Sequence, residues 1–279
     1  MLPEPSAAAP SPPSEQHRAA TGARTSAAEA LTRDHAAMDI ITDLVAEQER
    51  LEGILAGLDD SQWLAPSLCA GWTVADVVLH LAQTEESVVA SGAAGDATTW
   101  REGPDTVDAM METLVQEQRA APAEVFARWK SARRAAVETL RDADPSIRLR
   151  WAAAPLKPAT LATTRLAEHW AHALDIVEPL AIDFPDTDRL RHIAWLGHNT
   201  LPYAFSLDGR APAPIHCELT GPSGETWSYG PADAESRIVG SAGEFCRVGA
   251  HRLAARDSHL VATGPDAETA LKVLRNYAY

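Results

Sequence analysis

The stretch RLAEHWAHALDI, residues 165–176, has the spacing of a helix that carries polar chemistry along one face. Residues three or four apart lie on the same side of a helix, and the polar residues at that spacing here are Arg165, Glu168, His172 and Asp175. Glu168 and His172 stand at i and i+4, where two ligands one turn apart chelate a single metal ion. The same spacing also suits a plain Glu–His hydrogen bond, so the pair alone leaves both interpretations open.

Helical periodicity continues on either side of this stretch and predicts a bundle. Apolar residues recur at helical intervals through 40–58, 73–91, 105–118, 122–141 and 158–177. Thr73, followed three residues later by Asp76, resembles a capping box that opens one of these helices. The ranges 105–118 and 122–141 form one further helical stretch, in which Pro122 occupies a first turn or acts as a kink. We therefore expect an N-terminal four-helix bundle over residues 36–184.

The pattern changes in the last third of the chain. The elements expected there are a helix over 188–205, a β-hairpin over 215–220 and 226–229, helices over 239–254 and 266–277, and a strand around 259–263. The hairpin is predicted because two alternating runs flank the turn residues Gly221–Gly224. A small α+β domain over 185–279 follows, which places the whole chain in the α+β class.

Residues 1–30 have a different composition from the rest of the chain. They are rich in Pro, Ala and Ser and show no apolar periodicity. Such a segment cannot bury enough surface to offset the entropy lost on ordering, so we expect a disordered tail.

The charge balance excludes some partners. A formal net charge of -15 and a pI of about 5.0 oppose binding to nucleic acid, and no basic stripe interrupts that negative field. No run approaches the roughly 20 apolar residues of a membrane span, and the first 30 residues lack the apolar core of a signal peptide. We expect a cytoplasmic protein without a nucleic acid or membrane partner.

The cysteines do not form a recognisable motif. Cys69, Cys217 and Cys246 are far apart and include no C-x-x-C pair, so reduced structural thiols are the default. Cys69 stands just before a predicted helix start, where a thiolate is electrostatically favoured. A small buried residue in a turn is the alternative interpretation.

His80 lies among apolar residues on the helix predicted over 73–91. A histidine in that setting is more often a core residue than a ligand, and periodicity cannot join it to Glu168 and His172. The neighbouring histidines His169 and His192 are out of register with that pair.

Two separated motifs supply the connection. The run WLAPSLCAGWTVADVVLHLA, residues 63–82, resembles the signature around the first metal histidine of the mycothiol-dependent maleylpyruvate isomerase family, a branch of the DinB-like metal-binding bundles. Residues 165–176 resemble the segment that carries that family's other two ligands. The resemblance implies a divalent metal ion, with zinc the expected one, held by His80, Glu168 and His172.

The resemblance extends to the end of the chain. LPYAF at 201–205 and IVGSAGEFC at 238–246 resemble the small C-terminal domain attached to such bundles, which is similar to sterol carrier domains. Arg247 and Arg252 are candidates for the family's substrate-binding arginine. His198 and Asn199 are placed to reach a cleft between the two domains, although a polar pair at a helix end explains them equally well.

The implied ligand set predicts a catalytic centre. Two imidazoles and one carboxylate leave an open metal position for water, substrate or a thiol. Family members use the low-molecular-weight thiol mycothiol, which implies cis–trans isomerisation or S-transfer on a small electrophilic substrate. Asp175 is a candidate to orient a ligand imidazole, with a solvated carboxylate or a salt bridge as the alternative. Arg165 is a candidate to hold Glu168 or a substrate anion, with a surface arginine as the alternative.

Other functions remain open from the sequence. A metal acting as a Lewis acid without any thiol would make the chain a lyase, cyclase or hydrolase of secondary metabolism. A non-catalytic protein that binds metal or an apolar ligand is the third interpretation. The sequence contains no Gly-rich phosphate loop, no G-x-S-x-G and no H-E-x-x-H, which argues against nucleotide-dependent and serine-hydrolase chemistry. It leaves the oligomeric state open.

Overall fold

The structure is a computed structural model that describes residues 40–94, 107–151, 154–211 and 213–277. The tail expected over residues 1–30 lies outside the described residues. Residues 40–279 form one compact unit, so the domain boundary between 184 and 185 stays a prediction.

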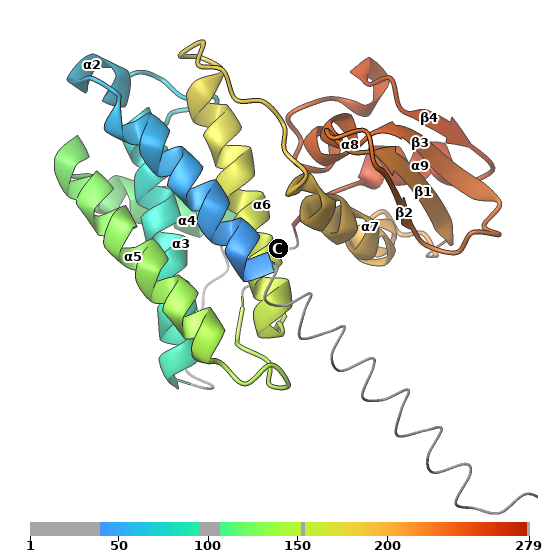
Figure 1. The fold of residues 1–279 in the computed structure, drawn as a ribbon, viewed down its shortest axis with the longest axis horizontal. Coiled ribbons are helices and arrows are strands. Elements are labelled where there is room, and N and C mark those ends of the chain that lie inside the picture. The colour runs from blue at the N-terminus through green and yellow to red at the C-terminus, as the bar shows by residue number, and fades with distance from the viewer. Residues whose placement is uncertain (1–39, 95–106, 152–153, 212, 278–279) are drawn as a thin grey trace, which may run out of the picture. The chain divides into compact units, whose positions relative to one another are not determined.

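Long helices build the N-terminal part, as predicted. They are the helix of residues 40–56, α3 (Val74–Ala94), α5 (Pro122–Asp142) and α6 (Pro158–Val177), joined by the shorter α2 (Asp60–Trp63) and α4 (Val107–Glu117). Figure 1 shows the four long helices packed side by side. Helix α3 is central, because it contacts α4, α5 and α6.

Local sequence signals start these helices. The backbone N–H of Thr73 donates to Asp76 Oδ2 at 2.9 Å, and the backbone N–H of Asp76 donates back to Thr73 Oγ1 at 3.2 Å. This reciprocal pair is the predicted capping box at the start of α3. Pro122 and Pro158 occupy the first turns of α5 and α6, where a missing N–H costs nothing.

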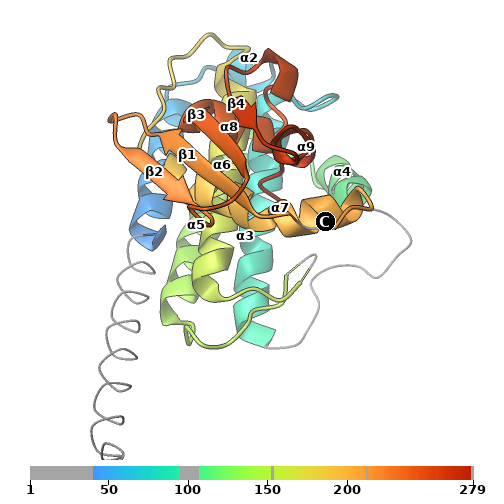
Figure 2. The ribbon, with the colours of Figure 1, turned by 90° about the vertical axis from the view of Figure 1, so that its right-hand side faces the viewer.

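The C-terminal part is a four-stranded sheet with helices. Its elements are α7 (Leu190–Leu207), β1 (Ile215–Thr220), β2 (Thr226–Tyr229), β3 (Ser236–Ser241), α8 (Ala242–Gly249), a 3-10 turn (Ala255–Asp257), β4 (Val261–Thr263) and α9 (Ala267–Val273). The strand order is β2-β1-β3-β4, with β1 parallel to β3 and the other two pairings antiparallel (Figure 2). The predicted α+β class is confirmed.

Two helix predictions in this part are wrong in extent. Residues 239–241 are the end of strand β3, and the helix that follows stops at Gly249 instead of 254. Helix α9 covers only 267–273 of the predicted 266–277. Strand β3 lies between two partners, β1 in parallel and β4 in antiparallel orientation, and neither joins it through a short hairpin turn. It also runs directly into α8, so no local turn signal marks it as a strand.

Burial along strand β1 alternates over its second half, as expected for a sheet with one covered face. Cys217 and Leu219 are buried, whereas Glu218 and Thr220 are exposed. Ile215 and His216, at the start of the strand, are both buried. Helices α8 and α9 contact the strands of the sheet, and α7 contacts both of these helices.

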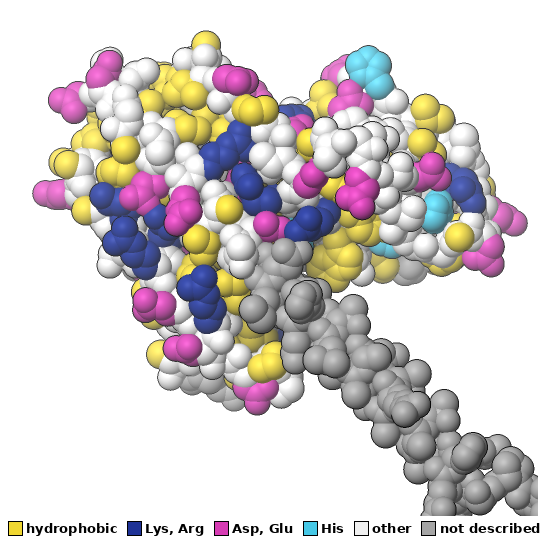
Figure 3. Space-filling view, in the orientation of Figure 1, with side chains coloured by type: hydrophobic (Ala, Val, Ile, Leu, Met, Phe, Trp, Pro, Cys, Tyr) yellow, Lys and Arg dark blue, Asp and Glu magenta, His cyan; other side chains and the backbone are white. Residues whose placement is uncertain are grey.

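The surface mixes charges of both signs. On the face in Figure 3, Lys and Arg side chains lie among Asp and Glu side chains. Among the described residues, no helix combines the length and apolar character needed to cross a membrane.

Candidate metal centre

Helix packing brings three side chains with metal-ligating atoms together. His80 comes from α3, and Glu168 and His172 come from successive turns of α6. His80 Nε2 lies 2.9 Å from Glu168 Oε1, and His172 Nε2 lies 3.4 Å from the same oxygen. One ligand atom from each residue falls within 4.8 Å of the others. The structure therefore gathers the three residues that the resemblance implied.

Hydrogen bonds orient the His172 imidazole. Its Nδ1 donates to Asp175 Oδ2 at 2.9 Å, which leaves Nε2 facing Glu168. This carboxylate–histidine arrangement is the one that fixes the tautomer and ring angle of metal-ligating histidines. The predicted orienting contact from Asp175 is present.

The contacts within the cluster favour a protonated His172 beside an ionised Glu168. Burial alone lowers the pKa of His172, but hydrogen bonds to Asp175, Cys69 and Glu168 outweigh it, and the pKa lies well above its usual value. Burial alone raises the pKa of Glu168, but hydrogen bonds from His172 and His80 hold it well below its usual value. A bound cation would displace that proton.

His80 fits the role of a neutral ligand. Burial is the main cause of its lowered pKa, so the imidazole is uncharged at neutral pH. Its Nδ1 is buried without a hydrogen-bond partner among the described residues. The chemistry of the donor set, two imidazoles and one carboxylate, suits a divalent metal ion.

Asp175 is buried and charged. Its exposed fraction is only 2%, so the solvated carboxylate considered from sequence is wrong. Arg252 Nε donates to Asp175 Oδ1 at 3.0 Å, and Arg252 Nη2 donates to Oδ2. Burial raises the pKa of Asp175, but the hydrogen bonds from His172 and Arg252 prevail and lower it.

The end of helix α8 aims Arg252 at this carboxylate. His251 adopts a left-handed conformation with φ of 59°, and the backbone N–H of Arg252 donates to Arg247 O at 2.8 Å. These are the features of a Schellman turn, which reverses the chain after a helix. Of the two arginines suggested by sequence, the structure brings Arg252 to the cluster, whereas Arg247 pairs with Asp186 at 2.6 Å.

Arg165 is a buried residue and not a surface one. It is 2% exposed, its Nε donates to Glu85 Oε1 at 3.0 Å, and its Nη2 donates to Thr84 Oγ1 at 2.6 Å. It therefore acts on the neighbouring Glu168 through its charge, which helps to lower the pKa of that carboxyl. Sequence reasoning missed Glu85, which is fully buried and lies on α3.

His169 and His192 form hydrogen bonds with residues outside the cluster, as expected from their positions out of register with Glu168 and His172. His169 Nδ1 donates to Arg165 O at 2.8 Å and its Nε2 accepts from Trp129 Nε1 at 3.2 Å, so the ring is neutral. Burial, with the nearby Arg165 charge, lowers the pKa of His169 to about 3. His192 Nε2 bonds with Asp43 at 2.8 Å.

Cys69 was the cysteine singled out by sequence, and it lies beside the cluster. Its Sγ donates to Asp175 Oδ2 at 3.2 Å and lies 3.7 Å from His172 Nδ1. A second group also has one potential ligand atom from each residue within 4.8 Å of the others, and it consists of Cys69, His172 and Asp175. Arg252 already donates to both carboxylate oxygens of Asp175, so we assign this group to the support of His172.

The cluster opens into a cavity of about 830 Å³. Three tryptophans line it, Trp72, Trp151 and Trp195, together with Asn199. Trp63 and Trp170 are buried in the core, whereas Trp72 lines the cavity. His198 instead bonds to the backbone oxygen of Ile215 at 2.9 Å.

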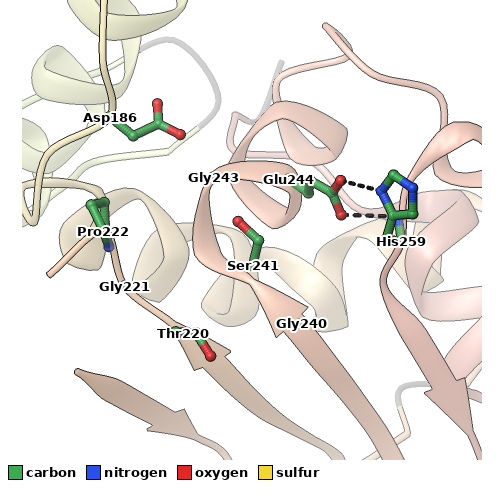
Figure 4. A pocket seen from close by; sticks show the side chains of 9 residues that line it. All are labelled: Asp186, Thr220, Gly221, Pro222, Gly240, Ser241, Gly243, Glu244 and His259. Atoms are coloured by element: carbon green, nitrogen blue, oxygen red, sulfur yellow. Dashed lines mark hydrogen bonds and ion pairs between the residues drawn. The ribbon is translucent and has the colours of Figure 1, made fainter. Parts of the chain in front are cut away.

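A second pocket of about 530 Å³ lies at the ends of β1 and β3 next to α8 (Figure 4). Glu244 and His259 face each other there, with 2.7 Å between Glu244 Oε1 and His259 Nδ1. Asp186 is paired with Arg247. Among the described residues, neither of the two candidate metal groups contains a residue that lines this pocket.

Comparisons with known proteins agree with this fold and site. Residues 44–177 match the family described as mycothiol maleylpyruvate isomerase N-terminal domain. Two uncharacterized proteins of Mycobacterium tuberculosis, from strains CDC 1551 and H37Rv, are each 35% identical over 243 residues, covering 85% of this chain and 95% of their own.

Solved structures share the fold. Crystal structures of the mycothiol-dependent maleylpyruvate isomerase and of a histidine-to-alanine mutant of it align with TM-scores of 0.55 and 0.54, at 16% identity, over 82% of this chain and 96% of theirs. Fold and site together define a helical bundle that gathers two histidines and a glutamate beside a small α+β unit. The chain belongs to the mycothiol-dependent maleylpyruvate isomerase family.

Proposed function

We propose that this chain is an enzyme that holds one divalent metal ion, with zinc the expected one, at His80, Glu168 and His172. It uses a low-molecular-weight thiol, mycothiol by family membership, on a small electrophilic substrate. The reaction is cis–trans isomerisation or S-transfer. The observation that carries the proposal is the convergence of the three ligand atoms on the wall of a cavity of about 830 Å³.

The geometry suits a catalytic rather than a closed structural metal site. Three protein ligands leave at least one position open, and His80, Glu168 and His172 all border the cavity. When bound there, a divalent ion lowers the pKa of a coordinated thiol and so supplies a nucleophile at neutral pH.

The surrounding residues prepare this chemistry. Asp175 keeps the His172 proton on Nδ1, so that Nε2 is available as a ligand. Arg252 compensates the Asp175 charge, so the carboxylate stays ionised although it is buried. Trp72 packs against His80, with 5.2 Å between ring centroids, and so adds an apolar side chain next to this ligand.

The kind of substrate determines the outcome of thiol attack. Addition of a thiolate to one carbon of a cis enone makes the former double bond single, so the adduct can rotate. Elimination then returns the thiol and leaves the trans isomer, with no net gain or loss of a proton. On a substrate with a leaving group, the new carbon–sulfur bond forms as the bond to that group breaks and the group departs with the electron pair. On an epoxide, a ring carbon–oxygen bond breaks and the oxygen takes up a proton to become a hydroxyl group. In both cases the sulfur stays attached to the carbon, which is S-transfer.

Elemental analysis of the purified chain tests the site, with His172→Ala as the variant and His192→Ala as the matched control. We expect about one equivalent of metal in the parent and the control and little in the variant, because two of three ligands hold a divalent ion poorly. Equal metal in parent and His172→Ala would refute the site.

The reaction is tested on the metal-loaded protein. Isomerisation of dimethyl maleate to dimethyl fumarate is followed by proton NMR with and without added thiol. Conversion that needs both metal and thiol supports the proposal. Metal-dependent conversion without thiol would favour a Lewis-acid enzyme, and metal without any conversion would favour a binding protein.

A further inference from the structure

The two histidines of the proposed metal cluster are oriented by different kinds of contact. The imidazole of His172 is fixed through its Nδ1, which donates to Asp175 Oδ2 at 2.9 Å. The Nδ1 atom of His80 is buried and has no hydrogen-bond partner among the described residues. The terminal torsion of a histidine has broad energy wells, so a ring without this hydrogen bond depends on packing to keep its direction.

Two aromatic rings pack against His80. The indole of Trp72 lies 5.2 Å away between ring centroids, at an interplanar angle of 48°. The imidazole of His172 lies 4.9 Å away at 73°, but it belongs to the cluster itself. The indole is therefore an aromatic neighbour from outside the cluster whose position limits the rotation of the His80 ring.

Helix α4 holds this indole in place. Trp72 Nε1 donates to Glu112 Oε2, and this N–H is the single hydrogen-bond donor of the side chain. The backbone of Trp72 is fixed separately, because its N–H donates to Cys69 O at 3.0 Å and its carbonyl oxygen accepts from the Ser67 N–H at 2.9 Å. The loop thus fixes the position of the residue, and Glu112 fixes the direction of its ring.

Neighbouring side chains hold Glu112 in turn. Its Oε1 accepts a hydrogen bond from Gln116 Nε2, one turn further along α4. Arg119, just beyond α4, donates to both carboxylate oxygens of Asp76 at 2.8 and 3.0 Å. The pKa of Arg119 is raised mainly by its hydrogen bonds to Asp76, and the negative charge of Glu112 adds to the effect. Glu112 therefore has a hydrogen bond within α4 and an opposite charge at the start of α3, the helix that carries His80.

On the basis of the metal site in the proposed function, we propose that Glu112 is a positioning residue for His80. Its carboxylate holds the Trp72 indole by Nε1, and the indole keeps the imidazole turned with Nε2 toward Glu168 Oε1, 2.9 Å away. His80 and His172 are then oriented by two independent carboxylates, one acting through a second ring and one through a direct hydrogen bond. A ligand already held in its bound orientation loses less conformational freedom when it binds.

Four substitutions separate the direction of the indole from the attachment of α4. Glu112→Ala removes the acceptor for Trp72, whereas Glu112→Gln keeps an oxygen that can accept the same hydrogen bond. Trp72→Phe keeps a ring beside His80 but loses Nε1. Val115→Ala is the matched structural control, because Val115 lies on α4, is 0% exposed and is not one of the residues that line the cavity.

Co2+ added to the metal-free full chain is the probe of the ligands. Its visible absorption bands depend on ligand geometry, and competition with a chromogenic chelator gives the affinity. We expect Glu112→Ala and Trp72→Phe to change the band shape and to weaken Co2+ binding by about five- to tenfold. Glu112→Gln and Val115→Ala should keep the parent spectrum and stay within about twofold of the parent affinity.

Three results of this measurement would overturn the proposal. An unchanged spectrum and affinity in Glu112→Ala would mean that the indole does not depend on this carboxylate. An equal loss in Val115→Ala would mean that only the attachment of α4 matters. An equal loss in Glu112→Gln would assign the effect to the charge of Glu112 and not to the hydrogen bond with Trp72.

Histidine NMR of the metal-free chain distinguishes this inference from the proposed function. With isotope-labelled histidine, the ring signals of His80 are identified by their absence from His80→Ala, and they respond to the ring current of the Trp72 indole. We expect them to shift in Glu112→Ala and to stay in place in Val115→Ala. A shift without metal binding by the parent would refute the metal site and support the hold of Glu112 on His80. Metal binding by the parent with unmoved His80 signals would keep the metal site and overturn the role of Glu112.

Discussion

Arg252 donates hydrogen bonds to both carboxylate oxygens of Asp175, and these two residues join the C-terminal part of the chain to the last turn of helix α6. Asp175 Oδ2 also accepts a hydrogen bond from Nδ1 of His172. The C-terminal part therefore contacts a proposed metal ligand through a single carboxylate. The C-terminal part supplies none of the three proposed ligands. Through Arg252 and Asp175 it can nevertheless influence the proposed metal centre.

Asp175→Asn should lower the affinity for metal by about 10- to 100-fold, because a carboxylate that accepts a hydrogen bond from a ligand imidazole sets its basicity and orientation. Competition with a chromogenic chelator measures the change. The matched control is Asp186→Asn, which removes a carboxylate paired with Arg247 away from the ligands and should leave the affinity within about twofold. Equal losses in both variants would argue against an orienting role for Asp175.

Arg252→Gln should weaken metal binding by about tenfold at pH 7, because Asp175 would then be buried without its counter-ion. Arg247→Gln breaks a similar arginine–aspartate pair and should keep the parent affinity. Thermal denaturation of both variants with chelator present separates a general loss of stability from a specific loss of metal. If the two variants bind metal equally well, Arg252 has no positioning role.

His169 should make stability depend on pH in the metal-free protein. The unfolded chain takes up a proton at this residue as the pH falls through about 6.5, whereas the buried imidazole stays neutral down to about 3. The free energy of unfolding therefore falls by about 1.4 kcal/mol per pH unit in that window as the pH is lowered.

The variant His169→Gln lacks this group. Urea denaturation at pH 6.5 and 4.5 should show the parent losing about 2 to 3 kcal/mol more than the variant between the two pH values. Parallel losses in the two proteins would mean that His169 is protonated in the folded state.

Metal should stabilise the fold, because the proposed ligands come from two helices that unfolding separates. At free metal about 1,000 times the dissociation constant, the gain is about 4 kcal/mol. For a chain of this size the gain corresponds to a rise in melting temperature of roughly 10 °C. Differential scanning calorimetry measures it, and His80→Ala should lose the rise. The same rise in parent and variant would place the stabilising ion elsewhere.

Local patterns predicted much of the helical part. The capping box of Thr73 and Asp76 and the proline at 122 lie within or next to the helices that they start, so their geometry is visible in a short window. The spacing of Glu168 and His172 is local for the same reason. Strand β3 was missed because parallel pairing with β1 leaves no local signature.

In the candidate site too, local sequence predicted some features and missed the contacts between distant segments. Residues 165–176 placed four polar side chains on one helix face, but they did not show that Arg165 and Asp175 are buried ion-pair partners of Glu85 and Arg252. Those partners lie 80 and 77 positions away along the chain. Burial and pairing depend on which helices pack together, and helical periodicity does not encode that choice.

The sequence by itself determined the long helices of the N-terminal part, the β1–β2 hairpin and the Glu168–His172 pair, because each arises from residues close together along the chain. Periodicity could not join His80 to Glu168, 88 positions later, and only the family resemblance suggested it; the tertiary structure decided that the two residues share a cluster. The tertiary structure alone decided that Arg252 reaches Asp175. It also decided that three tryptophans border one cavity together with two arginines that are each paired with a buried carboxylate. The physical reason is that these contacts depend on the burial of apolar helix faces against one another, which sets the distance between segments that are remote in sequence.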